Sequence, residues 1–206
     1  LSNQFRFKFD LYNTDILHDF FDVPLKIYTR SSLEGTWNDN TGKYSISCYF
    51  PQFQYKTDYI ESGVFLFNNY ADEIQSTLRF NHHRKSSATT LALNLSAKEN
   101  EVYTKLDWGN SGDNTYSGSI IGKTHLTKEE ENESLKSLIE IEETQVILND
   151  SIWKVHPSTI EISNKEISVD NFLFSHLDQY LHINGKVSSL PEDTLQIDLN
   201  SMNIGY

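Results

Sequence analysis

The sequence predicts an all-β protein, and three observations lead to that prediction. Apolar and polar residues alternate with a period of two along much of the chain, as in strands whose two faces meet different environments. Clusters of Asn, Asp, Gly, Ser and Pro separate these runs at intervals of roughly 10 to 20 residues. No apolar run approaches the roughly 20 residues that a membrane-spanning helix needs. This spacing is expected of a sandwich, a barrel or a stacked array of strands.

The N-terminal region predicts one strand followed by one short helix. Residues 5–9, FRFKF, alternate phenylalanine with basic residues. Residues 13–21 favour one or two helical turns, because Asn13 or Thr14 can cap the first turn and Pro24 lies just beyond the end. We expect this helix to plug or cap one end of the sheet.

The rest of the chain predicts further strands joined by turns. The strands are expected at 91–95, 102–108, 116–126, 135–141, 160–162, 167–169, 181–187 and 195–199. The turn-forming clusters lie at 38–42, 109–114, 163–165 and 188–193. The acidic run 128–133, KEEENE, predicts a solvated loop between strands. Since no Pro/Gly/Ser linker interrupts the series, we expect residues 1–206 to be a single β-rich segment of a larger protein.

The composition excludes several classes of function. A formal charge of −12 argues against binding a nucleic-acid backbone, which requires clustered Lys and Arg. Cys48 is the single cysteine, so an intramolecular disulfide and a multi-cysteine zinc site are both excluded. Cys48 alternates with Tyr44, Ile46 and Phe50, which predicts a small buried apolar residue.

Catalytic motifs are missing from the sequence. It contains no G-x-S-x-G elbow, phosphate-binding loop, G-x-G-x-x-G or H-E-x-x-H. His82 and His83 are the sharpest metal candidates, but neighbours on a strand point to opposite faces, so they could share an ion only from a turn. We therefore predict a protein that is not an enzyme and that carries no cofactor and no metal.

Two tryptophans suggest carbohydrate binding as an alternative function. Trp37 and Trp108 each lie beside a predicted turn, where an exposed indole could stack on a sugar, as in a carbohydrate-binding β-sandwich. The other reading is that each ring closes the end of a core with its N–H near water. The sandwich predicts a compact shape and exposed indoles.

Several ordered stretches resemble the TamB-like translocation and assembly module family of double-membrane bacteria, within the AsmA-like superfamily. The resemblance includes an N-D-x-x-W-x-x-x-P pattern, a hydrophobic-x-I-x-G pattern and a P-E-D turn. The stretches are LDWGN (106–110), ILNDSIWKVHPSTIEI (147–162), ISVDNFLFSHLDQYLHINGKV (167–187) and LPEDTLQIDL (190–199), with 31–55 and 61–69 fitting the same repeats.

The resemblance implies an elongated, twisted open β array of U-shaped section with an apolar trough. It also implies a periplasmic location within a full-length protein anchored in a cell membrane, of which this chain is an internal section. The intact protein would support outer-membrane protein assembly, transport phospholipid between the membranes, or do both, without catalysis. The implied partners are phospholipid acyl chains and an outer-membrane β-barrel assembly protein.

A trough of this kind needs strands with a continuously apolar parity, because an acyl chain gains about 25 cal/mol per Å² of apolar area removed from water. The same positions could instead close a dry core, or belong to a structural rod whose edge docks protein strands. Unpaired edges also invite edge-to-edge dimers. The expected lining residues alternate along the predicted strands: Leu91, Leu93, Leu95, Leu106, Ile160, Ile162, Ile167, Val169, Leu181, Ile183, Leu195, Ile197 and Leu199.

Overall fold

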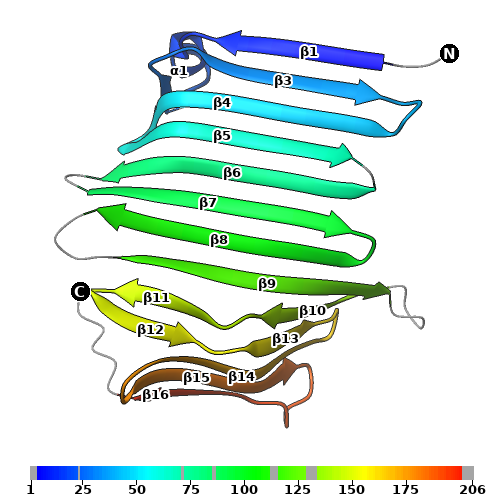
Figure 1. The fold of residues 1–206 in the computed structure, drawn as a ribbon, viewed down its shortest axis with the longest axis vertical. Helices are drawn as coiled ribbons and strands as arrows, with labels where there is room; N and C mark the ends of the chain where they lie inside the picture. The colour runs from blue at the N-terminus through cyan, green and yellow to red at the C-terminus, as the bar shows by residue number, and fades with distance from the viewer. Residues whose placement is uncertain are drawn as a thin grey trace. The chain divides into compact units, whose positions relative to one another are not determined.

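The computed structural model describes residues 4–22, 24–70, 72–84, 87–111, 116–128 and 134–200. Within these residues, the strands form one antiparallel sheet of 16 strands, and a single short helix lies near the N-terminus (Figure 1). The all-β prediction is confirmed. Because the described residues form one sheet, the two packed sheets of the sandwich alternative are not observed.

The helix is α1 (Asp15–Phe21). The strands are β1 (Gln4–Leu11), β2 (Leu25–Ile27), β3 (Ser31–Asn38), β4 (Lys43–Tyr55), β5 (Asp58–Tyr70), β6 (Glu73–Arg84), β7 (Ser87–Lys98), β8 (Glu101–Ser111), β9 (Ser117–Lys128), β10 (Leu135–Ile141), β11 (Thr144–Leu148), β12 (Ser151–Val155), β13 (Ser158–Ile162), β14 (Glu166–His176), β15 (Gln179–Ser188) and β16 (Leu195–Asn200).

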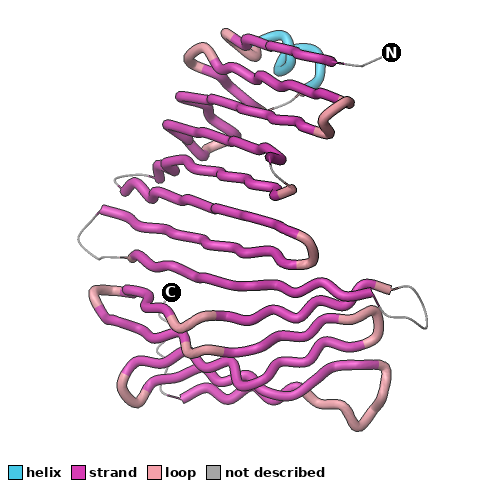
Figure 2. Tube along the Cα trace, turned by 45° about the vertical axis from the view of Figure 1, so that its right-hand side comes forward, coloured by secondary structure: helices cyan, strands magenta, loops and turns pink. Residues whose placement is uncertain are grey.

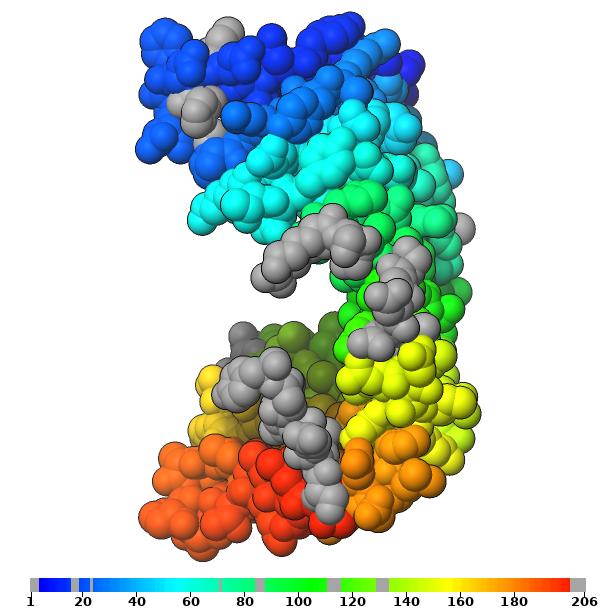
Figure 3. All heavy atoms as spheres, turned by 90° about the vertical axis from the view of Figure 1, so that its left-hand side faces the viewer, coloured from blue at the N-terminus to red at the C-terminus, as the bar shows by residue number. Residues whose placement is uncertain are grey.

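The chain divides into two compact units, each described here by itself. The N-terminal unit comprises Leu1–Lys98 and Leu106–Asp113, and the C-terminal unit comprises Glu99–Lys105 and Asn114–Tyr206. Figure 3 shows the atoms of the N-terminal unit, coloured blue to green, as a curved surface.

Strands of the N-terminal unit form an antiparallel meander. β2 and β3 pair with successive parts of β4, so they act as one interrupted strand. Figure 2 shows the strands in magenta and the loops that join them in pink. The buried Thr14 lies beside β2, where its Oγ1 donates to the Leu25 carbonyl at 2.5 Å and accepts from the Ile27 N–H at 3.1 Å. The predicted helix is thus confirmed, and the residue before it satisfies backbone groups at the edge of β2.

In the C-terminal unit the meander continues through two interrupted strands. β10 and β11 both pair with β9, while β12 and β13 both pair with β14. The second interruption falls at His156 and Pro157, where proline has no N–H to donate. His156 still donates its N–H to the Leu173 carbonyl at 2.9 Å, so the ladder continues across the break.

Two bulges shift which residue parity faces each side of the sheet. In β5 the register against β6 changes between Glu61 and Val64, and Ser62 has φ 54°. In β14 the register against β15 changes between Val169 and Phe172, next to Asn171 with φ 55°. An extra residue bends a strand and reverses the parity beyond it.

Most of the predicted turns are confirmed, and one is wrong in part. Turns occur at 38–42, 163–165 and 188–193, between the ends of the strands that flank them. Gly109, Asn110 and Ser111 instead lie in β8, because ladder pairing overrides the turn preference of these residues. Residues 112–114 lie outside the described residues, as do 129–133 of the acidic run; Lys128 is the last residue of β9.

Few side chains are fully buried. Among the described residues, the buried hydrophobic side chains are Val146, Trp153 and Val155, all in the C-terminal unit. The predicted burial of Cys48 is therefore wrong: its side chain is half-buried, since no second layer of described residues covers it. This partial burial raises the pKa of the Cys48 thiol.

Candidate functional site

The strand register places the hydrophobic residues of the N-terminal unit on one face of the sheet. Residues paired directly across antiparallel strands point to the same side. One complete row runs across six strands: Phe9, Leu33, Cys48, Phe65, Leu78 and Leu93. The row beside it comprises Phe7, Gly35, Ile46, Phe67, Ser76 and Leu95.

We call this surface the N-terminal apolar face. Its members are Phe5, Phe7, Phe9, Leu11, Leu33, Ile46, Cys48, Phe50, Phe65, Phe67, Leu78, Phe80, Leu91, Leu93 and Leu95. Three of them, Leu91, Leu93 and Leu95, are predicted lining residues. The other twelve, seven of which are phenylalanines, were not predicted as lining residues, although the alternation around Cys48 and at 5–9 indicated strands with an apolar side.

Two glycines on this face are covered by aromatic rings. A Cβ at Gly35 would collide with the ring of Phe7, and a Cβ at Gly63 would collide with the ring of Phe50. Each phenylalanine is the direct cross-strand partner of the glycine that it covers. The rings therefore lie flat on the sheet and keep the apolar face continuous.

An aromatic stack lies at the end of this face, where β3 turns into β4. Trp37 stacks on Tyr44 with ring centroids 5.0 Å apart, and Tyr44 stacks on Phe67 at 5.8 Å. The Trp37 Nε1–H donates to Asp39 Oδ1 at 3.2 Å, and its side chain is 48% exposed. Trp108 lies within β8 and is half-buried. The exposed indole of Trp37 agrees with one expectation of the sugar-binding alternative. Trp37 lies, however, in a single sheet and not in a sandwich of two sheets.

The opposite face of the N-terminal unit is polar and contains ion pairs. Arg30 donates to Asp10 at 2.9 and 3.1 Å, and this contact raises the pKa of the Arg30 guanidinium. Lys8 forms a hydrogen-bonded ion pair with Glu34, which lowers the pKa of that carboxyl group. The two faces of the unit therefore differ sharply in polarity.

The histidine pair lies within β6 rather than in a turn. His82 contacts Asp58 at 3.1 Å and His83 contacts Glu61 at 3.0 Å, from opposite sides of the strand. Among the described residues, no group of three or more His, Cys, Asp and Glu side chains could hold a metal ion.

The C-terminal unit has an apolar face of its own, which we call the C-terminal apolar face. Three rows define it: Ile139, Ile160, Val169, Gly185 and Leu195; Phe172, Ile183 and Ile197; Phe174, Leu181 and Leu199. A fourth pairing row adds Ile162, Ile167 and Val187. All nine predicted lining residues of this unit thus share one face: Ile160, Ile162, Ile167, Val169, Leu181, Ile183, Leu195, Ile197 and Leu199.

None of the thirteen predicted lining residues is fully buried. Ile162, Ile167, Ile197 and Leu199 are 38%, 48%, 57% and 58% exposed, and the other nine are half-buried. Leu106 lies in β8 with the parity opposite to Glu101, whose carboxylate contacts Lys123 at 2.8 Å on the polar side. These side chains line an open sheet surface.

One small core does form, in the part of the chain that carries the N-D-x-x-W pattern. Trp153 stacks on Phe174 with centroids 4.9 Å apart, and it pairs across the strands with Val146. Val146 and Val155 are each 4% exposed and Trp153 is 7% exposed. This tryptophan anchors the break between the interrupted strands and is therefore structural.

The polar face of the C-terminal unit contains several ion pairs. Lys136 contacts Glu161 at 2.8 Å, and Lys186 contacts Asp193 at 3.2 Å. The contact with Asp193 raises the pKa of Lys186, while a hydrogen bond from Ser188 lowers the pKa of Asp193. Ile152, 57% exposed, is an apolar exception on this face.

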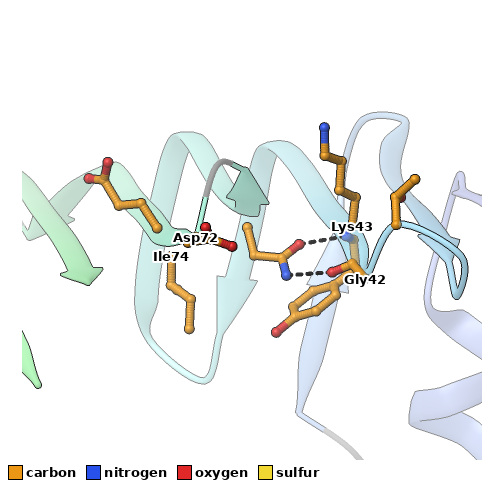
Figure 4. Close-up of a pocket in the computed structure, with 8 residues that line it drawn as sticks. Gly42, Lys43, Asp72 and Ile74 are labelled. Atoms are coloured by element: carbon orange, nitrogen blue, oxygen red, sulfur yellow. Dashed lines mark hydrogen bonds between the residues drawn. The ribbon is translucent and has the colours of Figure 1, made fainter. Parts of the chain in front are cut away.

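A hollow of about 440 Å³ lies at the end of the β4–β5–β6 hairpins (Figure 4). Its centre is the Asn69 side chain, which accepts from the Tyr44 N–H at 2.6 Å and donates to the Gly42 carbonyl at 2.7 Å. Asp72 and Ile74 lie across from Gly42 and Lys43. Because both polar atoms of Asn69 serve the backbone, we interpret this hollow as a hairpin end rather than a binding site.

Comparison with known proteins assigns no function to this chain. No protein-family model, no curated protein and no solved structure matches the chain. In the described part of the chain, no helix has the length and apolar character to cross a bilayer. The two amphipathic sheet faces are therefore the features on which a function can be argued.

Proposed function

We propose that this chain is a non-catalytic segment of a TamB-like periplasmic protein, and that its apolar faces hold the acyl chains of phospholipids. The intact protein would use such segments to move lipid between membranes or to support outer-membrane protein assembly. The observation that carries the proposal is an apolar sheet face in each unit on which every predicted lining residue is at least partly exposed.

The size of the N-terminal apolar face supports a lipid ligand. Phe5, Phe7, Phe9 and Leu11 mark four successive rows of this face, which extend about 20 Å along the strand at about 3.3 Å per residue. One leaflet of a bilayer has a hydrocarbon depth of roughly 15 Å. The row beyond Leu11 contains Ile27, Phe53 and Ile60 beside His82 and Thr89, and the row of Phe5 contains Trp37 and Tyr44. The apolar surface is therefore long enough to cover an acyl chain as deep as one leaflet.

The side chains of the C-terminal apolar face also fit flexible acyl chains rather than planar ligands. The C-terminal apolar face consists mainly of Ile, Leu and Val, which offer no hydrogen-bonding groups. Binding would then be non-directional and proportional to the apolar area that is covered, at about 0.8 kcal/mol per buried CH₂. Such a surface would accept lipids with different headgroups.

The first test compares two isoleucines that are equally exposed on opposite faces. Ile197 on the C-terminal apolar face and Ile152 on the polar face are both 57% exposed. We expect Ile197→Asp to reduce phospholipid uptake from phosphatidylethanolamine vesicles about tenfold, and Ile152→Asp to leave it unchanged, because a buried carboxylate opposes acyl contact. Native mass spectrometry measures bound lipid, and circular dichroism confirms that both variants fold. Equal uptake by the two variants would reject the lipid proposal.

The single cysteine provides a second readout, in the N-terminal unit. Cys48 lies on the apolar face and its neighbour Ser47 on the polar face. Lipid should slow the reaction of Cys48 with a water-soluble maleimide, whereas Cys48→Ser with Ser47→Cys should react at the same rate with and without lipid. If lipid shields both positions equally, the protection does not come from occupation of the apolar face.

A further inference from the structure

One end of the N-terminal apolar face differs from the rest in its aromatic residues. Beside the β3–β4 turn, Trp37 and Tyr44 pair directly across the two strands and stack with ring centroids 5.0 Å apart. Tyr44 also stacks on Phe67 at 5.8 Å. The rows of Phe7 and Phe9, as paired from β1 to β7, contain neither Trp nor Tyr. Amphipathic rings therefore lie beside the turn, and the aromatic residues of the next two rows are phenylalanines.

The indole of Trp37 has a polar edge that points to the turn and an apolar face that points to the sheet. Its Nε1–H donates to Asp39 Oδ1 at 3.2 Å, and Asp39 belongs to the turn. The ring face lies against Tyr44, while 48% of the side chain stays exposed. Membrane proteins place Trp and Tyr at the level of the headgroups, because such rings have one apolar and one polar side. Trp37 has the same arrangement between an apolar surface and a polar turn.

The opposite end of these strands, near the β4–β5 turn, has a different set of side chains. Ile27, Phe53 and Ile60 pair directly across β2, β4 and β5 and continue the apolar side. His82 pairs with Ile60, and its Nε2 contacts the Asp58 carboxylate at 3.1 Å. Figure 1 shows α1 at this end of the unit, away from the β3–β4 turn. Since His82 and Asp58 contact each other, the polar groups of this end already have partners.

We propose that a phospholipid lies along the strands of the N-terminal apolar face, with its headgroup at the β3–β4 turn and its acyl chains toward Phe53. The stack of Trp37 and Tyr44 then contacts the glycerol and ester groups of the lipid. This inference rests on the proposed function, because it gives the orientation of the same ligand. The reverse orientation would remove a charged headgroup from water against Phe53 and Ile60, which is unfavourable.

Quenching of tryptophan fluorescence by brominated lipid tests the orientation. The protein is loaded with phosphatidylethanolamine brominated either near the ester groups or near the methyl ends of the acyl chains, and free vesicles are removed. The emission of Trp37 is the difference between the unchanged protein and Trp37→Phe. We expect the bromines near the esters to quench this emission about twofold more strongly than those near the methyl ends, because the ring lies at the headgroup level.

A reciprocal probe reports on the other end of the strands. Phe53→Trp, made together with Trp37→Phe, adds an indole among Ile27 and Ile60. The added emission should be quenched more strongly by the bromines near the methyl ends. Native mass spectrometry establishes that the two lipids load equally, and circular dichroism establishes that each variant folds. If Phe53→Trp does not fold, the order of quenching at Trp37 decides alone.

Each outcome separates the orientation from the lipid proposal. Equal quenching of Trp37 by the two lipids, or the reverse order, overturns the orientation, while lipid found by mass spectrometry leaves the lipid proposal standing. A chain that takes up neither lipid overturns both. Opposite orders at Trp37 and at Phe53→Trp support a headgroup at the β3–β4 turn.

Discussion

At the scale of single residues, glycines under aromatic rings shape the apolar surface. Gly63 and Gly35 are covered by Phe50 and Phe7, so these positions contribute a flat surface although they lack side chains. Such pairs compensate for the weak strand preference of glycine. A ring that lies flat also shields the backbone amides beneath it from water.

We expect Gly63→Ala to destabilise the protein by about 1–2 kcal/mol, because the new methyl group displaces the Phe50 ring. Gly122→Ala is the matched control, since its Cβ would meet the Glu140 carbonyl at an ordinary 3.6 Å. Urea unfolding measures both free energies. Equal effects at the two positions would show that the ring does not hold its place on Gly63.

At the scale of elements, the meander depends on side chains that form hydrogen bonds with backbone groups at the ends of strands. Asn69 closes the end of β4 with two hydrogen bonds, and Thr14 does the same for β2. Pro157 breaks one long strand into β12 and β13 while the ladder with β14 continues on both sides. We therefore expect substitutions at strand ends to destabilise this sheet more than substitutions at strand centres.

Asn69→Ala should cost about 1–2 kcal/mol, because it leaves the Tyr44 N–H and the Gly42 carbonyl without their partner. Asn69→Asp keeps the acceptor for Tyr44 and should cost less. Amide hydrogen exchange at Tyr44 reports the local effect, with faster exchange in the alanine variant than in the aspartate variant. Identical exchange in both variants would contradict this account of the hairpin end.

At the scale of the whole molecule, the net charge and the ion pairs on the polar faces set the response to pH. The chain carries −12 at neutral pH, and ion pairs lie across neighbouring strands on the polar face of each unit. Hydrogen bonds lower the pKa of Glu34 (from Lys8), Glu101 (from Lys123) and Asp193 (from Ser188). Because the unfolded chain then binds more protons than the folded one, acid destabilises the fold.

We expect the melting temperature to change little from about pH 7 to about pH 5, and then to fall. The contribution of these carboxylates is complete above their ordinary values, 4.5 for Glu and 3.8 for Asp, and is lost as the pH drops through the lowered values. Calorimetry at a series of pH values measures the slope. Glu34→Gln should make that slope shallower, and an unchanged slope would exclude Glu34 as a contributor.

Much of the fold follows from local pattern. Alternation at 135–141 predicts β10 to the residue, and the cap and stop signals around 13–24 predict α1. The turn at 109–111 is wrong because cross-strand pairing outweighs the preference of Gly, Asn and Ser for turns. For the candidate site, alternation predicted which residues of one strand share a face, but it did not predict which faces of neighbouring strands join. The aromatic residues of the N-terminal apolar face were left out of the predicted lining.

Alternation is sufficient to say that Leu181 and Ile183 share a side, since every second residue of a strand points the same way. It does not say which parity of a neighbouring strand joins them. In β14 the bulge at Asn171 moves the apolar side from Val169 to Phe172, an odd-to-even change that depends on pairing with β15. Pairing between distant segments and the bulges within them set the common face, because hydrogen-bond register is a property of two strands together.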